Sequence, residues 1–275
     1  MSKGKGAVWH QMSIRAFPVS WGIYTTIFFI HCNKSNTQRV FMQKSERVMR
    51  IVMSVILPVA MLFLAKEAAI AQTEYLNDGM TREKMCIVVD AGHGGKDPGK
   101  VGITGCYEKD INLQIAGKLK GFLEMEGIEV VFTRNDDYGL YSETDSNKKN
   151  TDMRNRVQLI EETNPVLTVS IHQDSYSDES IKGAQTFYYS GNAESKKLAG
   201  LIQKRLVSTL DKTNHRKEKV NDDYYLLKNT SSPIVIVECG FLSNTEECKA
   251  LESDYYQEKV AWAIYMGIMQ YLNTK

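Results

Sequence analysis

Two histidines of this sequence are candidate metal ligands because of the local sequence around each. His93 lies in the glycine-rich stretch 90–95, where glycines let the backbone bend tightly and approach a ligand closely. His172 directly follows the apolar run 166–171, at a strand end where a core residue would more commonly be aliphatic. A histidine satisfied by backbone groups is the structural alternative for His93. Two histidines and one carboxylate are a sufficient protein shell for a catalytic zinc ion, which keeps its fourth position for water.

Two glutamates could supply carboxylates to such a site. Glu108 opens a predicted helix just after the glycine-rich loop and could fold back towards His93. The alternative for Glu108 is a first-turn acid that complements the helix dipole. Glu238 ends the apolar run 234–237, which carries its carboxylate to a buried place where an unpaired charge is costly. Near a metal-bound water, Glu238 could act as general base and return the proton to a leaving amine.

Cys239 follows Glu238 and offers a rival mechanism in which a thiol paired with a histidine is the nucleophile. Adjacent residues of a strand point to opposite faces, so only one of the two can face the site. We favour Glu238. Inhibition by a chelator, and not by a thiol alkylating reagent, would exclude the cysteine mechanism.

Alternating strand-like and helix-like patterns must position these residues. The strand patterns cover 85–90, 128–133, 166–171, 184–189 and 234–238, and the helical patterns cover 111–123, 152–163, 198–206 and 260–271. This alternation predicts one α/β domain with a central, largely parallel sheet and helices on both faces. Because ligands bind at the carboxyl ends of such strands, we expect Asp90, His93, His172 and Glu238 to converge on one crevice.

Residues 1–71 are predicted to be an export leader. Residues 1–50 hold 8 Lys/Arg and one acid, whereas residues 72–275 hold 25 basic and 31 acidic residues. The apolar core 51–65 lies between basic residues and a small-residue site at 69–71, which is the layout of a signal peptide, with an uncleaved signal anchor as the alternative. Residues 1–41 exceed what a signal needs and indicate an over-extended start. Residues 72–84 have the polar composition of a linker, and 85–275 form the domain.

Composition and cysteine spacing exclude other classes. The formal net charge of +1 argues against a nucleic-acid binder, and 43% hydrophobic residues exclude a disordered polymer. The body holds Cys86, Cys106, Cys239 and Cys248, and no pair has the spacing of a zinc ribbon or a redox motif. We therefore expect free thiols.

Six sequence blocks, taken in order, resemble the zinc-dependent N-acetylmuramoyl-L-alanine amidases of the Amidase_3 family. They are VVDAGHGGKDPG (88–99), GCYEKDINLQIAGKL (105–119), GIEVVFTR (127–134), DMRNRVQLI (152–160), VSIHQDS (169–175) and VECGFLSNTEE (237–247). The resemblance covers essentially all of residues 85–273 and implies a mixed six-stranded sheet with flanking helices. It implies one Zn²⁺ ion on His93, Glu108 and His172, with Glu238 as the catalytic acid and base.

The activity that the resemblance implies is hydrolysis of the amide between the lactyl group of N-acetylmuramic acid and L-alanine of the peptidoglycan stem peptide. Within the family, GAQTFYY (183–189) and YYLLK (224–228), behind one membrane signal, resemble the sporulation-specific cortex amidases. This predicts an exported enzyme between the forespore membranes that prepares the muramic δ-lactam needed for germination. A general cell-wall autolysin and a wall-binding pseudoenzyme are the alternatives. A three-ligand site without a regulatory domain could also need a membrane-linked activator protein.

Five residues are candidates for substrate contacts. Arg134, Arg154 and Arg156 could pair with carboxylates of the peptidoglycan, although surface ion pairing is the alternative. Asp174, where relatives commonly carry Asn, and Asn244 are further candidates. Because both the domain and the wall polymer are anionic, affinity should come from such local contacts and not from global attraction.

Overall fold

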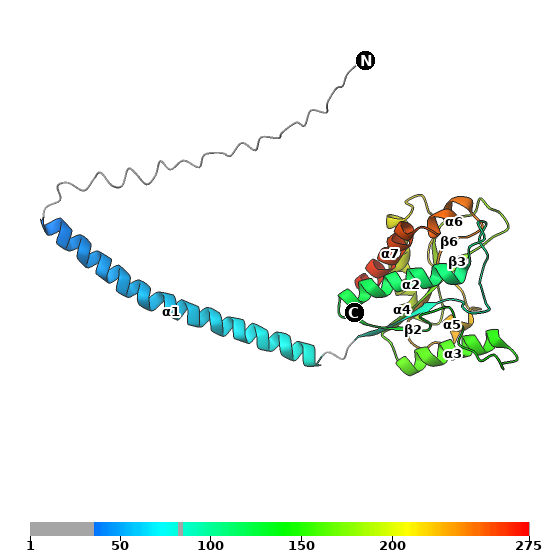
Figure 1. Cartoon of the computed structure of the whole chain (residues 1–275), viewed down its shortest axis with the longest axis horizontal. Coiled ribbons are helices and arrows are strands. Elements are labelled where there is room, and N and C mark those ends of the chain that lie inside the picture. Colours follow the sequence, from blue (N-terminus) through cyan, green and yellow to red (C-terminus); the bar gives the residue numbers. More distant parts are fainter. Residues whose placement is uncertain (1–35, 82–84, 275) are drawn as a thin grey trace, which may run out of the picture. The chain divides into compact units, whose positions relative to one another are not determined.

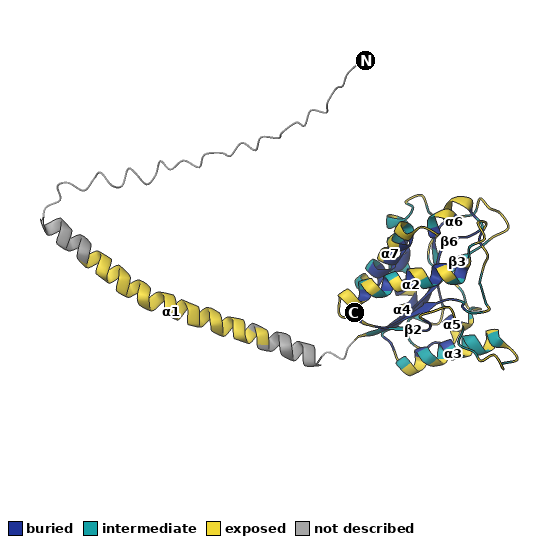
Figure 2. Ribbon diagram, in the orientation of Figure 1, coloured by how far each residue is buried: buried dark blue, intermediate teal, exposed yellow. Residues whose placement is uncertain are grey.

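The computed structural model describes residues 36–81 and 85–274, in two compact units that divide after Met80 (Figure 1). The first unit holds helix α1 (Asn36–Thr81) except for its last residue. An 18-residue window within its segment Lys44–Ile70 has a mean hydropathy of 2.4, and the segment is long and apolar enough to cross a membrane, by length and composition. Its described side chains are exposed (Figure 2). The predicted apolar core 51–65 thus lies within a longer apolar helix.

Much of the stretch 72–84, expected to be a linker, continues α1 as helix up to Thr81. Residues 82–84 and the first 35 residues, which include most of the suspected over-extension, lie outside the described residues.

A six-stranded mixed sheet forms the centre of the second unit. Its strands are β1 (Cys86–Ala91), β2 (Glu129–Phe132), β3 (Leu167–Asp174), β4 (Gln185–Tyr188), β5 (Lys219–Val220) and β6 (Ile234–Phe241). Their spatial order is β2-β1-β3-β6-β4-β5. The first four in this order are mutually parallel, β4 is antiparallel to β6, and β5 is parallel to β4. The predicted mixed, largely parallel sheet is confirmed. Hydrophobic periodicity missed β5 because two exposed residues carry no pattern.

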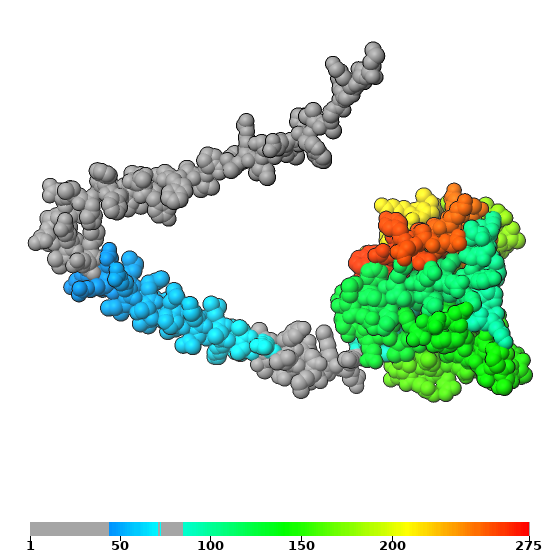
Figure 3. Space-filling view, viewed as in Figure 1, coloured from blue at the N-terminus to red at the C-terminus, as the bar shows by residue number. Residues whose placement is uncertain are grey.

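Helices cover both faces of this sheet. One face carries α2 (Glu108–Met125), α4 (Ala193–Thr209), α6 (Thr245–Leu251) and α7 (Asp254–Leu272). The other carries α3 (Lys148–Thr163) and the short α5 (Tyr225–Lys228). On the face shown in Figure 3, the green segment containing α2 and the red segment containing α7 lie side by side, as their mutual packing requires.

Strand residues alternate between two hydrophobic cores. In β1, Ile87 and Val89 belong to the core under α2, α4 and α7, whereas Val88 belongs to the core under α3 and α5. In β6, Val237 and Ile236 divide in the same way. Burying each such side chain fully contributes about 1.5–3 kcal/mol. The sheet is therefore a rigid platform, and its carboxyl edge is where polar residues appear.

The pairing of β3 with β6 fixes the positions of two of these polar residues. His172 lies directly opposite Glu238 in the parallel ladder, and the register shifts between His172 and Asp174. A β-bulge of this kind redirects side chains at the end of a strand. The ladder thus brings a histidine and a carboxylate from distant parts of the sequence to one place.

Candidate active site

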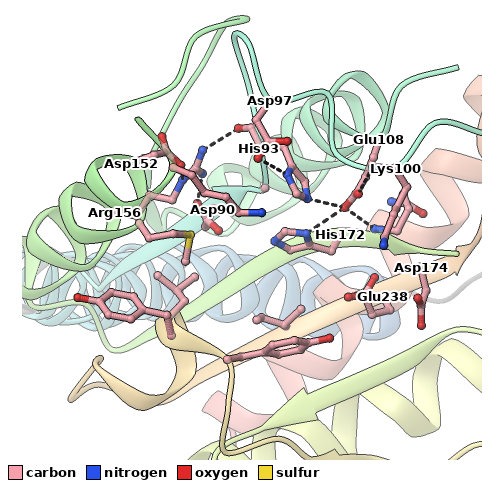
Figure 4. Close-up of a pocket in the computed structure, with 18 residues that line it drawn as sticks. Asp90, His93, Asp97, Lys100, Glu108, Asp152, Arg156, His172, Asp174 and Glu238 are labelled. Atoms are coloured by element: carbon pink, nitrogen blue, oxygen red, sulfur yellow. Dashed lines mark hydrogen bonds and ion pairs between the residues drawn. The ribbon is translucent and has the colours of Figure 1, made fainter. Parts of the chain in front are cut away.

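A cavity of about 370 Å³ opens at the carboxyl ends of β1, β3 and β6 (Figure 4). The residues expected to converge at this edge all line it, namely Asp90, His93, His172 and Glu238. Glu108, at the first position of α2, also lines the cavity. The crevice inferred from strand ends is therefore present.

The two histidines and Glu108 form a compact cluster. One Glu108 oxygen, Oε1, lies 3.2 Å from His93 Nε2 and 3.0 Å from His172 Nδ1. The imidazole rings meet edge to face, with their centroids 5.0 Å apart. The nitrogen and oxygen donors of all three side chains lie within 4.8 Å of one another, so the cluster could hold a metal ion.

Backbone and amide groups hold the Glu108 carboxylate, which is only 1% exposed. The Lys100 N–H donates to Oε2 at 2.8 Å, and the Gln173 N–H donates to Oε1 at 3.1 Å. Asn112, one helical turn along α2, donates its side-chain amide to Oε1 at 3.3 Å. Burial raises the pKa of Glu108, but hydrogen bonds and charge from both histidines outweigh it and hold the pKa well below its ordinary value. Glu108 is therefore a carboxylate and not a carboxylic acid.

His93 is held in an unusual backbone conformation. Its φ of 65° lies in the left-handed region, which residues other than glycine rarely adopt. Asp97 Oδ2 lies 2.9 Å from His93 Nδ1, which leaves Nε2 facing Glu108. Burial lowers the pKa of His93, yet the bonds to Asp97 and Glu108 raise it to about 9, and the bond to His93 helps to lower that of Asp97 to about 2. A carboxylate on the second imidazole nitrogen fixes the orientation of a ligating histidine.

Two buried arginines hold the loop that carries His93. Arg156 donates to the carbonyl oxygens of Ala91 at 2.9 Å and of His93 at 2.6 Å. Arg134 donates to the carbonyl oxygens of Ala91 at 2.9 Å and of Gly92 at 3.0 Å. Arg134 is 1% exposed and does not line the cavity. The expected contact between Arg134 and substrate is therefore corrected: its guanidinium supports the loop.

Asp90 forms a buried ion pair with Arg156. Arg156 Nη1 donates to Asp90 Oδ1 at 2.6 Å, and Asp90 is 1% exposed. Asp90 also accepts hydroxyl bonds from Thr133 and Ser170. Burial raises the pKa of Asp90, but the Arg156 charge and the two hydroxyls lower it to about 2. Asp90 thus lies at the cavity edge as the counter-ion of Arg156.

Glu238 and its neighbour Cys239 point to opposite sides of the sheet. Glu238 lines the cavity, and its buried Oε2 has no hydrogen-bond partner within the described residues. Burial, with repulsion from Glu108 and Asp174, raises the pKa of Glu238 well above its ordinary value. Cys239 is fully buried in the α2, α4 and α7 core, and burial raises the pKa of its thiol. The structure thus places the carboxylate, and not the thiol, at the site.

Of the other predicted substrate contacts, one lines the cavity and two do not. Asp174 lines the cavity beside Glu238. Arg154 is exposed on α3, outside the lining, and faces Thr151 at 3.5 Å. Asn244 is the N-cap of α6: its Oδ1 accepts from the N–H groups of Glu246 and Glu247. Asn244 and Arg154 do not line the cavity, and the role of Asn244 seen here is to begin a helix.

Sequence reasoning missed several residues of the site. Asp97 was one, although an acid four residues after a histidine in the same loop is a usable signal. Tyr224 lines the cavity and packs edge to face on Phe187, with centroids 5.8 Å apart. Burial and the Glu238 charge raise the pKa of Tyr224 to about 12, so its hydroxyl stays protonated. Lys149, exposed at the mouth, is the third.

Comparisons with known proteins show the family of this chain. The family model described as N-acetylmuramoyl-L-alanine amidase, Amidase_3, matches residues 87–270. The chain is 38% identical over 192 residues to the germination-specific N-acetylmuramoyl-L-alanine amidase of Bacillus subtilis, covering 69% of this chain and 80% of that protein.

Solved structures give the same picture. The CwlD amidase from Clostridioides difficile, in complex with the GerS lipoprotein, matches with a TM-score of 0.68 and 45% identity, covering 70% of this chain and all of that one. The catalytic domain of CwlV from Bacillus (Paenibacillus) polymyxa matches with a TM-score of 0.61 and 33% identity, covering 70% and 99%. The chain therefore belongs to the N-acetylmuramoyl-L-alanine amidase family and is an amidase that acts on peptidoglycan.

Proposed function

We propose that this amidase is zinc-dependent and that His93, Glu108 and His172 hold one Zn²⁺ ion. The observation that carries this proposal is the Glu108 oxygen lying between nitrogen atoms of both histidines. Two imidazoles and one carboxylate are a donor set of catalytic zinc sites. When bound, the ion supplies Lewis-acid polarisation of the scissile carbonyl and acidifies the attacking water.

The backbone around these ligands is shaped to admit them. A Cβ at Gly92 would lie 2.2 Å from Cε1 of His172. A Cβ at Gly99 would lie 2.5 Å from Oε2 of Glu108 and 2.8 Å from Cδ2 of His93. Only glycine at 92 and 99 leaves room for the ligand side chains where they stand. The glycine-rich loop is therefore part of the site.

Glu238 is proposed as the acid and base of the reaction. The bond cleaved is the amide between the lactyl group of N-acetylmuramic acid and L-alanine. Glu238 takes a proton from the attacking water and delivers it to the departing alanine nitrogen. Its buried, unpartnered Oε2 and raised pKa suit a group that must hold a proton between these two steps.

The biological setting proposed is the spore cortex, as the first step towards the muramic δ-lactam needed for germination. Support comes from the germination-specific relative and from the CwlD relative. The helix segment Lys44–Ile70 is proposed to export the chain, as signal peptide or anchor, to the space between the forespore membranes. Because the CwlD structure contains a lipoprotein, a membrane-linked activator is a reasonable partner here. A general autolysin and a wall-binding pseudoenzyme remain the rival functions.

The test combines purified protein and spores. Metal-loaded chain should release new N-terminal L-alanine from cortex peptidoglycan, and Glu238→Gln protein with the same zinc content should not. Metal-loaded protein that never releases amine, with or without a membrane-linked partner, would favour the pseudoenzyme. Spores lacking the gene should lose muramic δ-lactam in muropeptide profiles; unchanged δ-lactam with an altered vegetative wall would favour the autolysin.

A further inference from the structure

Two thiols lie together away from the cavity. Cys106 Sγ and Cys248 Sγ are 3.6 Å apart, although the residues are 142 positions apart in the sequence. Both are free thiols in the structure. Cys106 is half-buried in the loop before α2, and Cys248 is fully buried in α6. The fold, and not sequence spacing, makes them a pair.

Cys106 belongs to a hairpin that ends on a residue of the metal site. We call residues 100–108 the Glu108 hairpin. Val101 and Tyr107 pair as an antiparallel bridge, and the Glu108 N–H donates to the Lys100 carbonyl at 2.9 Å. In return, the Lys100 N–H donates to the Glu108 carboxylate at 2.8 Å. The conformation of this hairpin therefore sets the position of the Glu108 side chain.

The tip of the hairpin is already packed against the α6 region. The Ile103 N–H donates to the Leu242 carbonyl at 3.0 Å, just after β6. Thr104 Oγ1 lies 3.4 Å from Cys248 Sγ. A Cβ at Gly102 would lie 2.5 Å from Cys106 Sγ and 2.8 Å from Cys248 Sγ, so backbone packs directly onto both sulfurs. These contacts hold the two thiols side by side.

We propose that Cys106 and Cys248 form a disulfide that fastens the Glu108 hairpin to α6. The two thiols give up two protons and two electrons, and an external disulfide accepts them and becomes two thiols. The sulfurs must close from 3.6 Å to about 2.05 Å, which a small movement of an irregular loop can supply. Such a bond suits an exported protein. Its consequence, a firmer hold on Glu108 as metal ligand, rests on the proposed zinc site.

A metal ion on the thiols is the other chemistry that this place could offer. The donors of Cys106, Cys248 and the exposed Glu252 lie within 4.8 Å of one another. A structural zinc site is a closed shell of four ligands, and this group provides three. The disulfide needs only the two sulfurs already in contact, so the geometry favours it.

The test uses the full chain equilibrated with oxidised glutathione or with dithiothreitol, then quenched with N-ethylmaleimide and mapped by mass spectrometry. Oxidised protein should contain two fewer free thiols and a linked Cys106–Cys248 peptide, and should unfold at a higher temperature. Cys106→Ser should abolish the loss of thiols. Cys86→Ser, which removes a half-buried thiol of β1, should leave it unchanged.

A second measurement follows zinc release to a chelator, which should be severalfold slower in the oxidised protein. Equal release rates would overturn the link to Glu108. Alkylation of both thiols after oxidation, or a glutathione adduct on Cys106, would overturn the disulfide. A thiolate-to-metal charge-transfer band in reduced, Co²⁺-loaded protein would also overturn the disulfide, because it would show that the two thiols bind a metal ion. The linked peptide forms without catalysis, so failure of the amidase assay is a separate result.

Discussion

Replacing Asp90 with asparagine should destabilise the domain and loosen the His93 loop together. Asp90 is the buried counter-ion of Arg156, and Arg156 donates to the carbonyl of His93 at 2.6 Å. Asparagine keeps the size of the side chain and removes its charge. The variant therefore tests the contribution of the ion pair without changing the packing. Asp90 acts on the proposed zinc ligand His93 only through Arg156.

The size of the effect follows from the pKa of Asp90. Its folded-state value of about 2, against the ordinary 3.8, corresponds to about 2.5 kcal/mol at 1.36 kcal/mol per pKa unit. Because the folded pKa is the lower one, this contribution is complete above the unfolded pKa and is lost as pH falls towards 2. At pH 3 about half of it should remain. The difference between wild type and Asp90→Asn should therefore shrink by about half between pH 6 and pH 3.

Urea unfolding of the two proteins at several pH values, followed by intrinsic fluorescence to which Trp262 contributes, measures this difference. Asp254→Asn is the matched control, because Asp254 is an exposed partner of Lys118 and such pairs contribute less than about 1 kcal/mol. Zinc release should also be faster in Asp90→Asn than in the control. A destabilisation below 0.5 kcal/mol, or one independent of pH from 6 to 3, would refute the assignment of Asp90 as the ionised partner of Arg156.

Three other predictions concern the site itself. Glu238→Ala should keep zinc and lose cleavage, whereas His172→Ala should lose zinc as measured by metal analysis; an active Glu238→Ala enzyme would contradict the mechanism. Asp97→Asn should weaken zinc binding about 10–100-fold in chelator competition, because His93 loses the carboxylate that orients it; unchanged affinity would count against that role. Activity should fall with a chelator and survive thiol alkylation, since Cys239 is buried with a raised pKa; inactivation with Cys239 modified would revive the thiol mechanism.

The convergence of distant residues could be predicted because strand ends obey simple geometry. Apolar runs before Asp90, His172 and Glu238 are strong signals of buried strands, and parallel strands place their carboxyl ends at one edge. Side-chain alternation predicted that only one of Glu238 and Cys239 could face the cavity, and in the structure Glu238 lines the cavity whereas Cys239 lies in the core on the other side of the sheet.

The roles of the arginines could not be predicted in the same way. Charge alone does not say whether Arg134 meets solvent, substrate or backbone, and three of its four hydrogen bonds go to carbonyls that are distant in the sequence and that only the fold brings near. The role of Asn244 could have been predicted from the sequence. An asparagine followed two and three residues later by Glu246 and Glu247 is typical of a helix N-cap with acids in the first turn. The Cys106 and Cys248 pair had no signal, since 142 positions separate its members.

The strand that comes last in the sequence, β6, lies in the interior of the sheet, and this affects the order in which the domain can fold during synthesis. β6 lies between β3 and β4 and brings Glu238, whereas the proposed zinc ligands all precede residue 173. Because synthesis proceeds from the N-terminus, every nascent chain that ends before residue 234 lacks both the strand that joins the two halves of the sheet and the proposed proton acceptor. If Glu238 has the proposed role, amidase activity therefore requires synthesis of β6 (Ile234–Phe241), the last strand of the sheet in the sequence.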